Sequence, residues 1–254
     1  MPLLGAFVFP PIDELFRWKD IAFQGTPFAI NKTALEILIS TALILIIFIG
    51  GSRKKALHPG GVQNVVEMTY EFIDNGITKD VVGHDAGGYT PFLGALFLFI
   101  LFLNFWEIIP GFQFPPTSRM AVPGLLAITV YVLYLYTGFR HQGMKYLTGH
   151  LFPPGVPIAL YILVTPIEFV QLFLVRPFSL AVRLLANMMA GHILLTALAL
   201  LTAYSLTNAP IIAIGPFALN VAVTGFEILV GFLQAYIFTL LTAVYLADAL
   251  HPDH

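Results

Sequence analysis

Apolar residues occur along this chain in long blocks that polar clusters separate. A membrane-crossing helix needs roughly 20 apolar residues, and three blocks have about that length: Ala34–Gly50, Pro91–Ile109 and Ala121–Phe139. Two longer blocks follow, Val156–Leu206 and Ile211–Leu250, with a short turn-like TNAP sequence between them. The pattern predicts an all-α membrane protein with five membrane helices, forming a single membrane domain over residues 1–254.

The fourth block is too long for one upright helix. As a single α-helix its 51 residues would extend about 76 Å, whereas the hydrocarbon core of a bilayer is about 30 Å thick. The middle of the block reads RPFSLAVRLLANMMAGH, which lacks the composition of a loop. We therefore predict that residues 156–250 form two long, strongly tilted helices, with a bend in the first at Pro166 or Pro177.

Residues 62–82 differ in kind from these blocks. Apolar residues recur there at helical spacing, while Glu67, Glu71 and Asp74 share a polar face. This pattern is typical of an amphipathic helix at the membrane surface or against a partner. A helix within a soluble loop is the alternative.

Basic residues in the short loops predict the orientation. Lys and Arg are enriched in cytoplasmic loops, so Arg53-Lys54-Lys55 and the pair Arg140 and Lys145 should face the cytoplasm. The first three spans then cross the membrane in alternating directions. Residues 1–31 should form a tail on the outer side, and the C-terminus should be cytoplasmic.

Composition narrows the function classes. The chain has 254 residues, of which 58% are hydrophobic and 10% are charged, whereas a soluble domain has about 25% charged residues. The composition therefore argues against a soluble enzyme and against a nucleic-acid-binding protein. The absence of cysteine excludes thiolate metal sites, and no phosphate-binding loop is present. We expect no catalytic residue, no metal and no cofactor in this chain.

Several ionisable residues lie inside the apolar blocks, where each costs at least about 2.5–3.5 kcal/mol. Those between residues 156 and 250 are Glu168, Arg176, Arg183, His192, Glu227 and Asp248. Arg176 and Asp248 lie where side chains can reach the interface, so they are secondary candidates. Arg183 and Glu227 lie deep in their blocks and indicate a functional site.

Helical geometry groups these residues further. At 100° per residue, Glu227 and Gln234 lie about 20° apart on one face. Asn187 lies near the face of Arg183, and small residues at 186 and 190 adjoin it. Antiparallel packing of the last two helices would place Arg183 near the level of Gln234 and His192 near Glu227. The His192–Glu227 pair is our prediction, although nine residues turn His192 away from the Arg183 face.

Each of these residues also has a purely structural interpretation. A membrane arginine can cap carbonyls, a lone histidine can be hydrogen-bonded in a core, and Asn187 and Gln234 can simply join two helices. Because Arg183, His192 and Glu227 occur at matching depths, a proton path explains the set better than independent structural roles.

Two long motifs resemble subunit a of F-type ATP synthases. Residues 176–192, RPFSLAVRLLANMMAGH, resemble its signature, and residues 233–245, LQAYIFTLLTAVY, resemble its last helix. The PGGVQ sequence at 59–63 and the NFWEIIP sequence at 104–110 also fit. The resemblance extends from about residue 30 to the end of the chain.

The resemblance implies a stator that holds two long helices against a rotating ring of c subunits and conducts protons through two half-channels. Arg183 matches the essential arginine that faces the ring carboxylate. Asn187, His192, Glu227 and Gln234 match positions of the half-channel open to the outer side, where some members have the acid and the histidine exchanged. Glu168 matches a further acidic position of proton access. The implied partners are the c-ring, the b subunits of the peripheral stalk and membrane lipid, with no nucleic acid.

Two alternatives belong to other function classes. A proton-coupled secondary transporter would use similar residues, but the chain is short and lacks an inverted repeat. A non-conducting membrane scaffold would use the charges for structural pairing alone. The absence of a recognisable transit peptide favours a bacterial plasma membrane over an organelle membrane.

Overall fold

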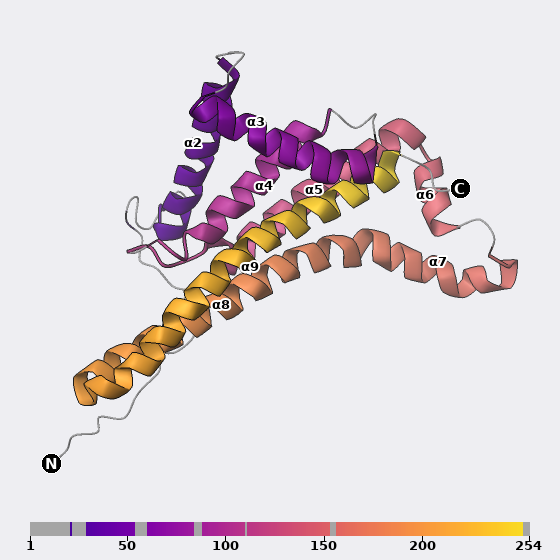
Figure 1. The fold of residues 1–254 in the computed structure, drawn as a ribbon. Helices are drawn as coiled ribbons and strands as arrows, with labels where there is room; N and C mark the ends of the chain where they lie inside the picture. The colour runs from indigo at the N-terminus through magenta and orange to yellow at the C-terminus, as the bar shows by residue number, and fades with distance from the viewer. Residues whose placement is uncertain are drawn as a thin grey trace.

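The computed structural model describes residues 21, 29–53, 60–83, 88–109, 111–152 and 156–250. Most of the expected outer tail, Lys54 and Lys55 lie outside these residues. The described elements, seen in Figure 1, are α2 (Lys32–Arg53), α3 (Val62–Ile73), η1 (Asp74–Val82), α4 (Thr90–Phe105), η3 (Pro116–Ser118), α5 (Ala121–Gln142), α6 (Lys145–Leu151), η4 (Ile158–Leu160), α7 (Tyr161–Val170), η5 (Gln171–Val175), α8 (Arg176–Asn208) and α9 (Pro210–Leu250).

The predicted fold class, an all-α membrane protein, is confirmed. Four helical runs are long and apolar enough to cross a membrane, namely α2, α5, the run from η4 through α8, and α9. At the expected second span, α4 is a shorter apolar helix of 16 residues. It ends at Phe105, and the expected last residues of that span form turns instead. Glu107 therefore lies in a turn that follows the helix.

The fourth block is one continuous helical run, from Ile158 to Asn208. Its direction changes between α7 and α8 (Figure 1), at the π-helical turn η5, which lies between the two prolines expected to cause the bend. Pro177, which has no backbone N–H to donate, lies directly after this turn, in the first turn of α8. The Tyr134 hydroxyl donates a hydrogen bond to the Leu172 carbonyl at 2.9 Å, which holds this wide turn against α5.

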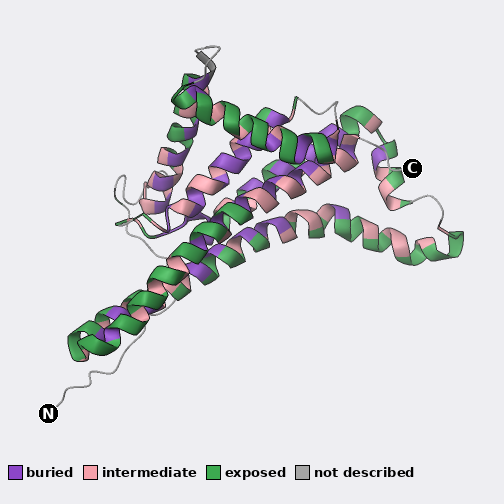
Figure 2. Cartoon of the chain, in the orientation of Figure 1, coloured by how far each residue is buried: buried purple, intermediate pink, exposed green. Residues whose placement is uncertain are grey.

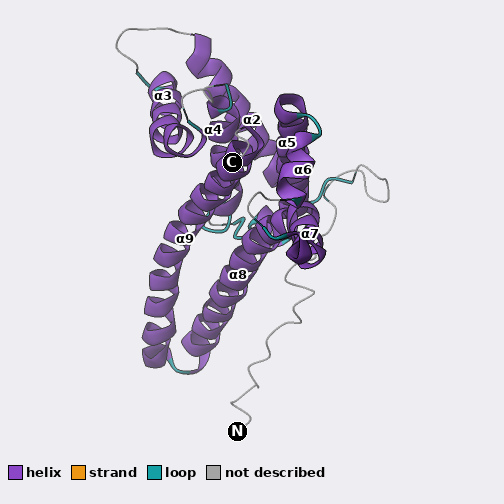
Figure 3. Ribbon diagram, turned by 90° about the vertical axis from the view of Figure 1, so that its right-hand side faces the viewer, coloured by secondary structure: helices purple, strands orange, loops and turns teal. Residues whose placement is uncertain are grey.

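Helices α8 and α9 run antiparallel and side by side, joined by a short turn (Figure 3). The second half of α9 forms the centre of the molecule, and its buried apolar residues include Ala235, Phe238, Ala243, Leu246 and Ala249. The first half of α9 projects with the end of α8 and is largely exposed (Figure 2). The hairpin of α8 and α9 thus has a covered end, where other helices pack around it, and an open end at the turn between the two helices, where it is largely exposed.

The expected amphipathic segment is present as α3 followed by η1. Ile73 and Ile77 are fully buried, while Glu67 and Glu71 are exposed. Asp74 joins this segment to α4, because its carboxylate accepts a hydrogen bond from the hydroxyl of Thr90 at 3.1 Å. Within η1, the same carboxylate lies 2.8 Å from the Lys79 ammonium. The hydrogen bond from Lys79 lowers the pKa of Asp74.

Candidate functional site

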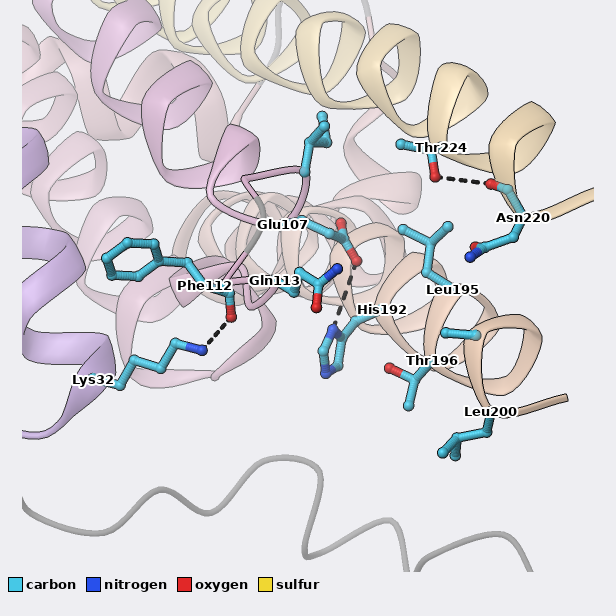
Figure 4. Close-up of a pocket in the computed structure, with 13 residues that line it drawn as sticks. Lys32, Glu107, Phe112, Gln113, His192, Leu195, Thr196, Leu200, Asn220 and Thr224 are labelled. Atoms are coloured by element: carbon cyan, nitrogen blue, oxygen red, sulfur yellow. Dashed lines mark hydrogen bonds and ion pairs between the residues drawn. The ribbon is translucent and has the colours of Figure 1, made fainter. Parts of the chain in front are cut away.

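A cavity of about 530 Å³ opens between α8, α9 and the loop that follows α4 (Figure 4). It is formed where the shorter α4 ends and its loop crosses the two long helices. The polar or charged residues that line it are Lys32, Glu107, Gln113, His192, Thr196, Asn220 and Thr224. A polar wall of this kind suits water and ions, because isolated polar groups facing lipid are costly.

His192 and Glu107 meet at the wall of this cavity. Nδ1 of His192 lies 3.8 Å from Oε1 of Glu107 (Figure 4), and the two residues are only 7% and 5% exposed. The Phe114 ring packs edge-on against the imidazole, with ring centroids 5.2 Å apart. The imidazole is thus held in one orientation next to a carboxylate, an arrangement that can share a proton.

Glu227, the acid that the sequence analysis paired with His192, lies against the neighbouring residue on α8. A Cβ atom built on Gly191 would lie 2.5 Å from Oε2 of Glu227, so the carboxylate occupies the space that this glycine leaves. Glu227 thus lies opposite the residue that precedes His192 on α8. The ion-pair partner that the structure gives His192 is Glu107, because the nine-residue offset from Arg183 turns His192 toward the loop.

Asn187 and Gln234 connect the two long helices further toward the covered end. The Asn187 amide donates a hydrogen bond to Oε1 of Gln234 at 2.7 Å. Gln234 is buried, whereas Asn187 is exposed. This contact agrees with the predicted antiparallel register to within about one helical turn.

Arg183 lies one turn before Asn187 on the same open face of α8. Arg183 and Asn187 are exposed, as are the small residues Ala186 and Ala190 between and beyond them. Among the described residues, no carboxylate lies within ion-pair distance of the guanidinium. The face combines one permanent cation with small side chains, which allows another helix to approach closely.

Asn104 fixes α4 to α9 between Glu227 and Gln234. Its amide donates a hydrogen bond to the Gly231 carbonyl at 3.1 Å, and its Oδ1 accepts one from the Thr117 hydroxyl at 2.8 Å. The sequence analysis noted Asn104 as part of a motif and assigned it no role. Glu107 was missed because a carboxylate at the end of an apolar block is not unusual by itself.

The two secondary candidates, Arg176 and Asp248, form an ion pair of 3.1 Å at the other end of the long helices. The Arg176 guanidinium also lies over the Tyr245 ring, 5.3 Å from its centroid. Gln142 donates hydrogen bonds to the carbonyls of Asp248 and Ala249, at 3.2 and 2.9 Å. These contacts clamp together the start of α8 and the ends of α5 and α9.

Glu168 is not brought to this site. It lies half-buried on α7, fifteen residues before Arg183, which corresponds to about 22 Å along a helix. The π-helical turn η5 separates it from α8. Its position is thus remote from the cavity that His192 lines.

Comparison with known proteins gives consistent matches. Residues 34–247 match the family described as ATP synthase A chain. The protein named ATP synthase subunit a from Frankia alni is 38% identical over 96% of this chain and 87% of its own length. Its namesake from Rhodopseudomonas palustris is 40% identical over 96% of each chain. The one from Granulibacter bethesdensis is 41% identical over 85% of this chain and 86% of its own.

Proposed function

Because the chain belongs to the ATP synthase A chain family and is a non-catalytic, proton-translocating subunit of an F-type synthase, we propose which of its residues carry the proton. The cavity beside His192 is the aqueous access from the outer side of the membrane. The observation that supports this most directly is the pairing of buried His192 with Glu107 on the cavity wall.

The path continues from this pair along the contact of α8 with α9. Glu227 lies against Gly191, next to His192, and the Asn187–Gln234 hydrogen bond lies closer to the open face of α8. An imidazole titrates near pH 6.5 and can therefore take up and release a proton near neutral pH. The proton passes from the cavity through His192, Glu107 and Glu227 to the face that carries Asn187.

Arg183 acts at the end of this path, opposite a carboxylate of the c-ring. An ionised carboxylate cannot cheaply face lipid, so the ring carboxylate has to be protonated there. Next to a fixed cation it prefers the ionised form, and a guanidinium keeps its charge even when water is removed. Arg183 thus drives proton release and blocks direct leakage, and each proton that crosses 100 mV delivers about 2.3 kcal/mol to rotation.

The remaining assignments concern orientation and partners. The open face of α8 receives the c-ring, and b subunits of the peripheral stalk and lipid cover other apolar surfaces. Glu168 belongs to proton access away from the outer cavity, and the Arg176–Asp248 clamp lies at the cytoplasmic end. The whole chain forms one domain in a bacterial plasma membrane, with the N-terminus outside and the C-terminus in the cytoplasm.

Substitution of Arg183 tests the proposal. Arg183→Ala should abolish proton-driven ATP synthesis in membrane vesicles while the assembled complex remains, because the exposed side chain contributes charge and little packing. Arg183→Lys should recover little, since it lacks the planar fork. Arg140→Ala, which removes an exposed cation at the end of α5, is the matched control. Normal synthesis by assembled Arg183→Ala complexes would overturn the assignment.

A further inference from the structure

A third buried carboxylate lies near the cavity, outside the path described above. Glu36 on α2 is fully buried, and the buried residues Thr33 and Ser40 share its face of the helix. Neither carboxylate oxygen of Glu36 accepts a hydrogen bond from a described residue. A buried carboxyl group without hydrogen bonds keeps a negative charge only where nearby cations compensate it.

Two cations supply that charge, and both belong to the surroundings of the cavity. Lys32 precedes Glu36 by one helical turn, lines the cavity and donates a hydrogen bond to the Phe112 carbonyl (Figure 4). Arg119, which follows η3, is the other cation whose charge acts on Glu36.

Arg119 also reaches the proton path through an aromatic contact. Its guanidinium lies over the Phe114 ring, 5.5 Å from the centroid, and that same ring packs edge-on against His192. Partial burial lowers the pKa of Arg119, and the negative charge of Glu36 opposes this effect. Lys32 and Arg119 therefore form a positively charged neighbourhood beside His192, and the charge of Glu36 opposes it.

We propose that Glu36 is a positioning residue for proton uptake: it neutralises part of the positive charge of Lys32 and Arg119 and so sets the pH at which the His192–Glu107 pair is loaded. This inference rests on the proposed role of the cavity as the outer proton access. Its direction follows from Coulomb's law, because added positive charge disfavours the protonated pair. Among the described residues, the charged groups that act on Glu36 are Lys32 on its own helix and Arg119 after η3.

Helix α3 also packs on α2 but contributes no charge at Glu36. Its contact lies where Val66 approaches Gly51, fifteen residues along α2 from Glu36. The exposed carboxylates of Glu67 and Glu71 follow on α3, beyond that contact. The charges that act on Glu36 therefore come from the end of α2 that lies at the cavity.

The test uses the intact synthase in liposomes, with the cavity side facing the acidic lumen. The rate of ATP synthesis is measured against luminal pH at constant external pH and clamped membrane potential. Glu36→Gln should move the profile to lower pH by about half a unit, the size expected for one partly screened charge that does not contact the pair directly. Lys32→Gln should move it to higher pH.

The double variant Glu36→Gln with Lys32→Gln separates charge balance from packing. Because it restores the wild-type net charge, the opposite shifts of the two single variants should cancel, and its profile should return close to that of the wild type. Two packing defects give no reason for shifts in opposite directions. Thr33→Val, a neutral change on the same buried face, is the matched control and should leave the profile in place. Unchanged profiles in the single variants, shifts of both single variants in the same direction, or a double variant whose profile stays displaced from that of the wild type would overturn the proposal.

The outcome is also distinguishable from failure of the proposed proton path. If His192→Ala impairs synthesis but Glu36→Gln leaves the pH profile unchanged, the role of Glu36 is rejected and the path stands. If His192→Ala also has no effect, the path itself is rejected, and the role of Glu36 is rejected with it.

Discussion

Nδ1 of His192 lies 3.8 Å from Oε1 of Glu107, although one residue belongs to a long helix and the other to a turn after a shorter one. Both side chains are buried, and both line the same cavity. A histidine and a carboxylate this close together in a cavity wall are expected to act as one unit in proton exchange.

The first prediction is that His192 and Glu107 are functionally coupled. His192→Ala and Glu107→Ala should each lower proton-driven ATP synthesis by roughly tenfold or more, because each removes half of a proton-exchanging pair. The double variant should be little worse than either single variant. Synthesis rates in membrane vesicles, normalised to assembled complex, measure the coupling.

An exchange of the two side chains provides the control. His192→Glu combined with Glu107→His should recover part of the lost activity, and the corresponding exchange of His192 with Glu227 tests the pair predicted from sequence. If His192 were only a packing residue, the losses would be additive, exchange would rescue nothing, and less complex would assemble. That pattern would reject the pair.

A second prediction concerns the space that Gly191 leaves for Glu227. In Gly191→Ala the new Cβ atom would lie 2.5 Å from Oε2 of Glu227, so the carboxylate has to move or the helices have to separate. Overpacking of this kind typically costs about 1–3 kcal/mol. We expect slower proton-driven synthesis, with assembly reduced less than activity.

Gly225→Ala is the matched control for Gly191→Ala. Gly225 lies on α9 only two residues from Glu227, but nothing lies within 4 Å of a Cβ atom built there. The substitution should leave proton-driven synthesis close to the wild-type rate. Equal effects of the two alanines would show that the tight contact is unimportant.

The level at which α8 and α9 meet was predictable from sequence because the geometry of a helical hairpin is regular. A short turn makes the two helices antiparallel neighbours, and a constant rise per residue then sets which residues lie opposite one another. Asn187 with Gln234, and Gly191 with Glu227, lie within about a turn of the predicted levels.

The contributions of loops and bends were not predictable in the same way. Glu107 reaches His192 because α4 ends early and its loop folds across α8, and no periodic pattern encodes such a path. The bend between α7 and α8 lies at a π-helical turn held by Tyr134, whereas the prolines were the visible signal. Glu36 lies within an apolar block, and one of its two cationic neighbours, Arg119, comes from a segment distant in sequence.

The last prediction concerns the orientation of the chain. The chain contains no cysteine, so a single introduced cysteine reacts with thiol reagents without background from this subunit. Glu71 is exposed on α3, which follows the expected cytoplasmic end of α2. Glu71→Cys should therefore react with a membrane-impermeant maleimide from the cytoplasmic side.

Met120 provides the opposite reference, because it is 45% exposed just before α5, on the side expected to face outward. Met120→Cys should react with the same maleimide from the outer side only. Right-side-out and inverted vesicles, labelled in parallel, give the two readings for each variant. Both helices of the long hairpin are connected to these segments through α4 and α5, so the two labels together determine which side the cavity faces. If Met120→Cys reacts from the cytoplasmic side, then the cavity cannot be the outer proton access, and the order of the proton path has to be inverted. If Glu71→Cys reacts from the outer side, the expected cytoplasmic position of α3 is wrong.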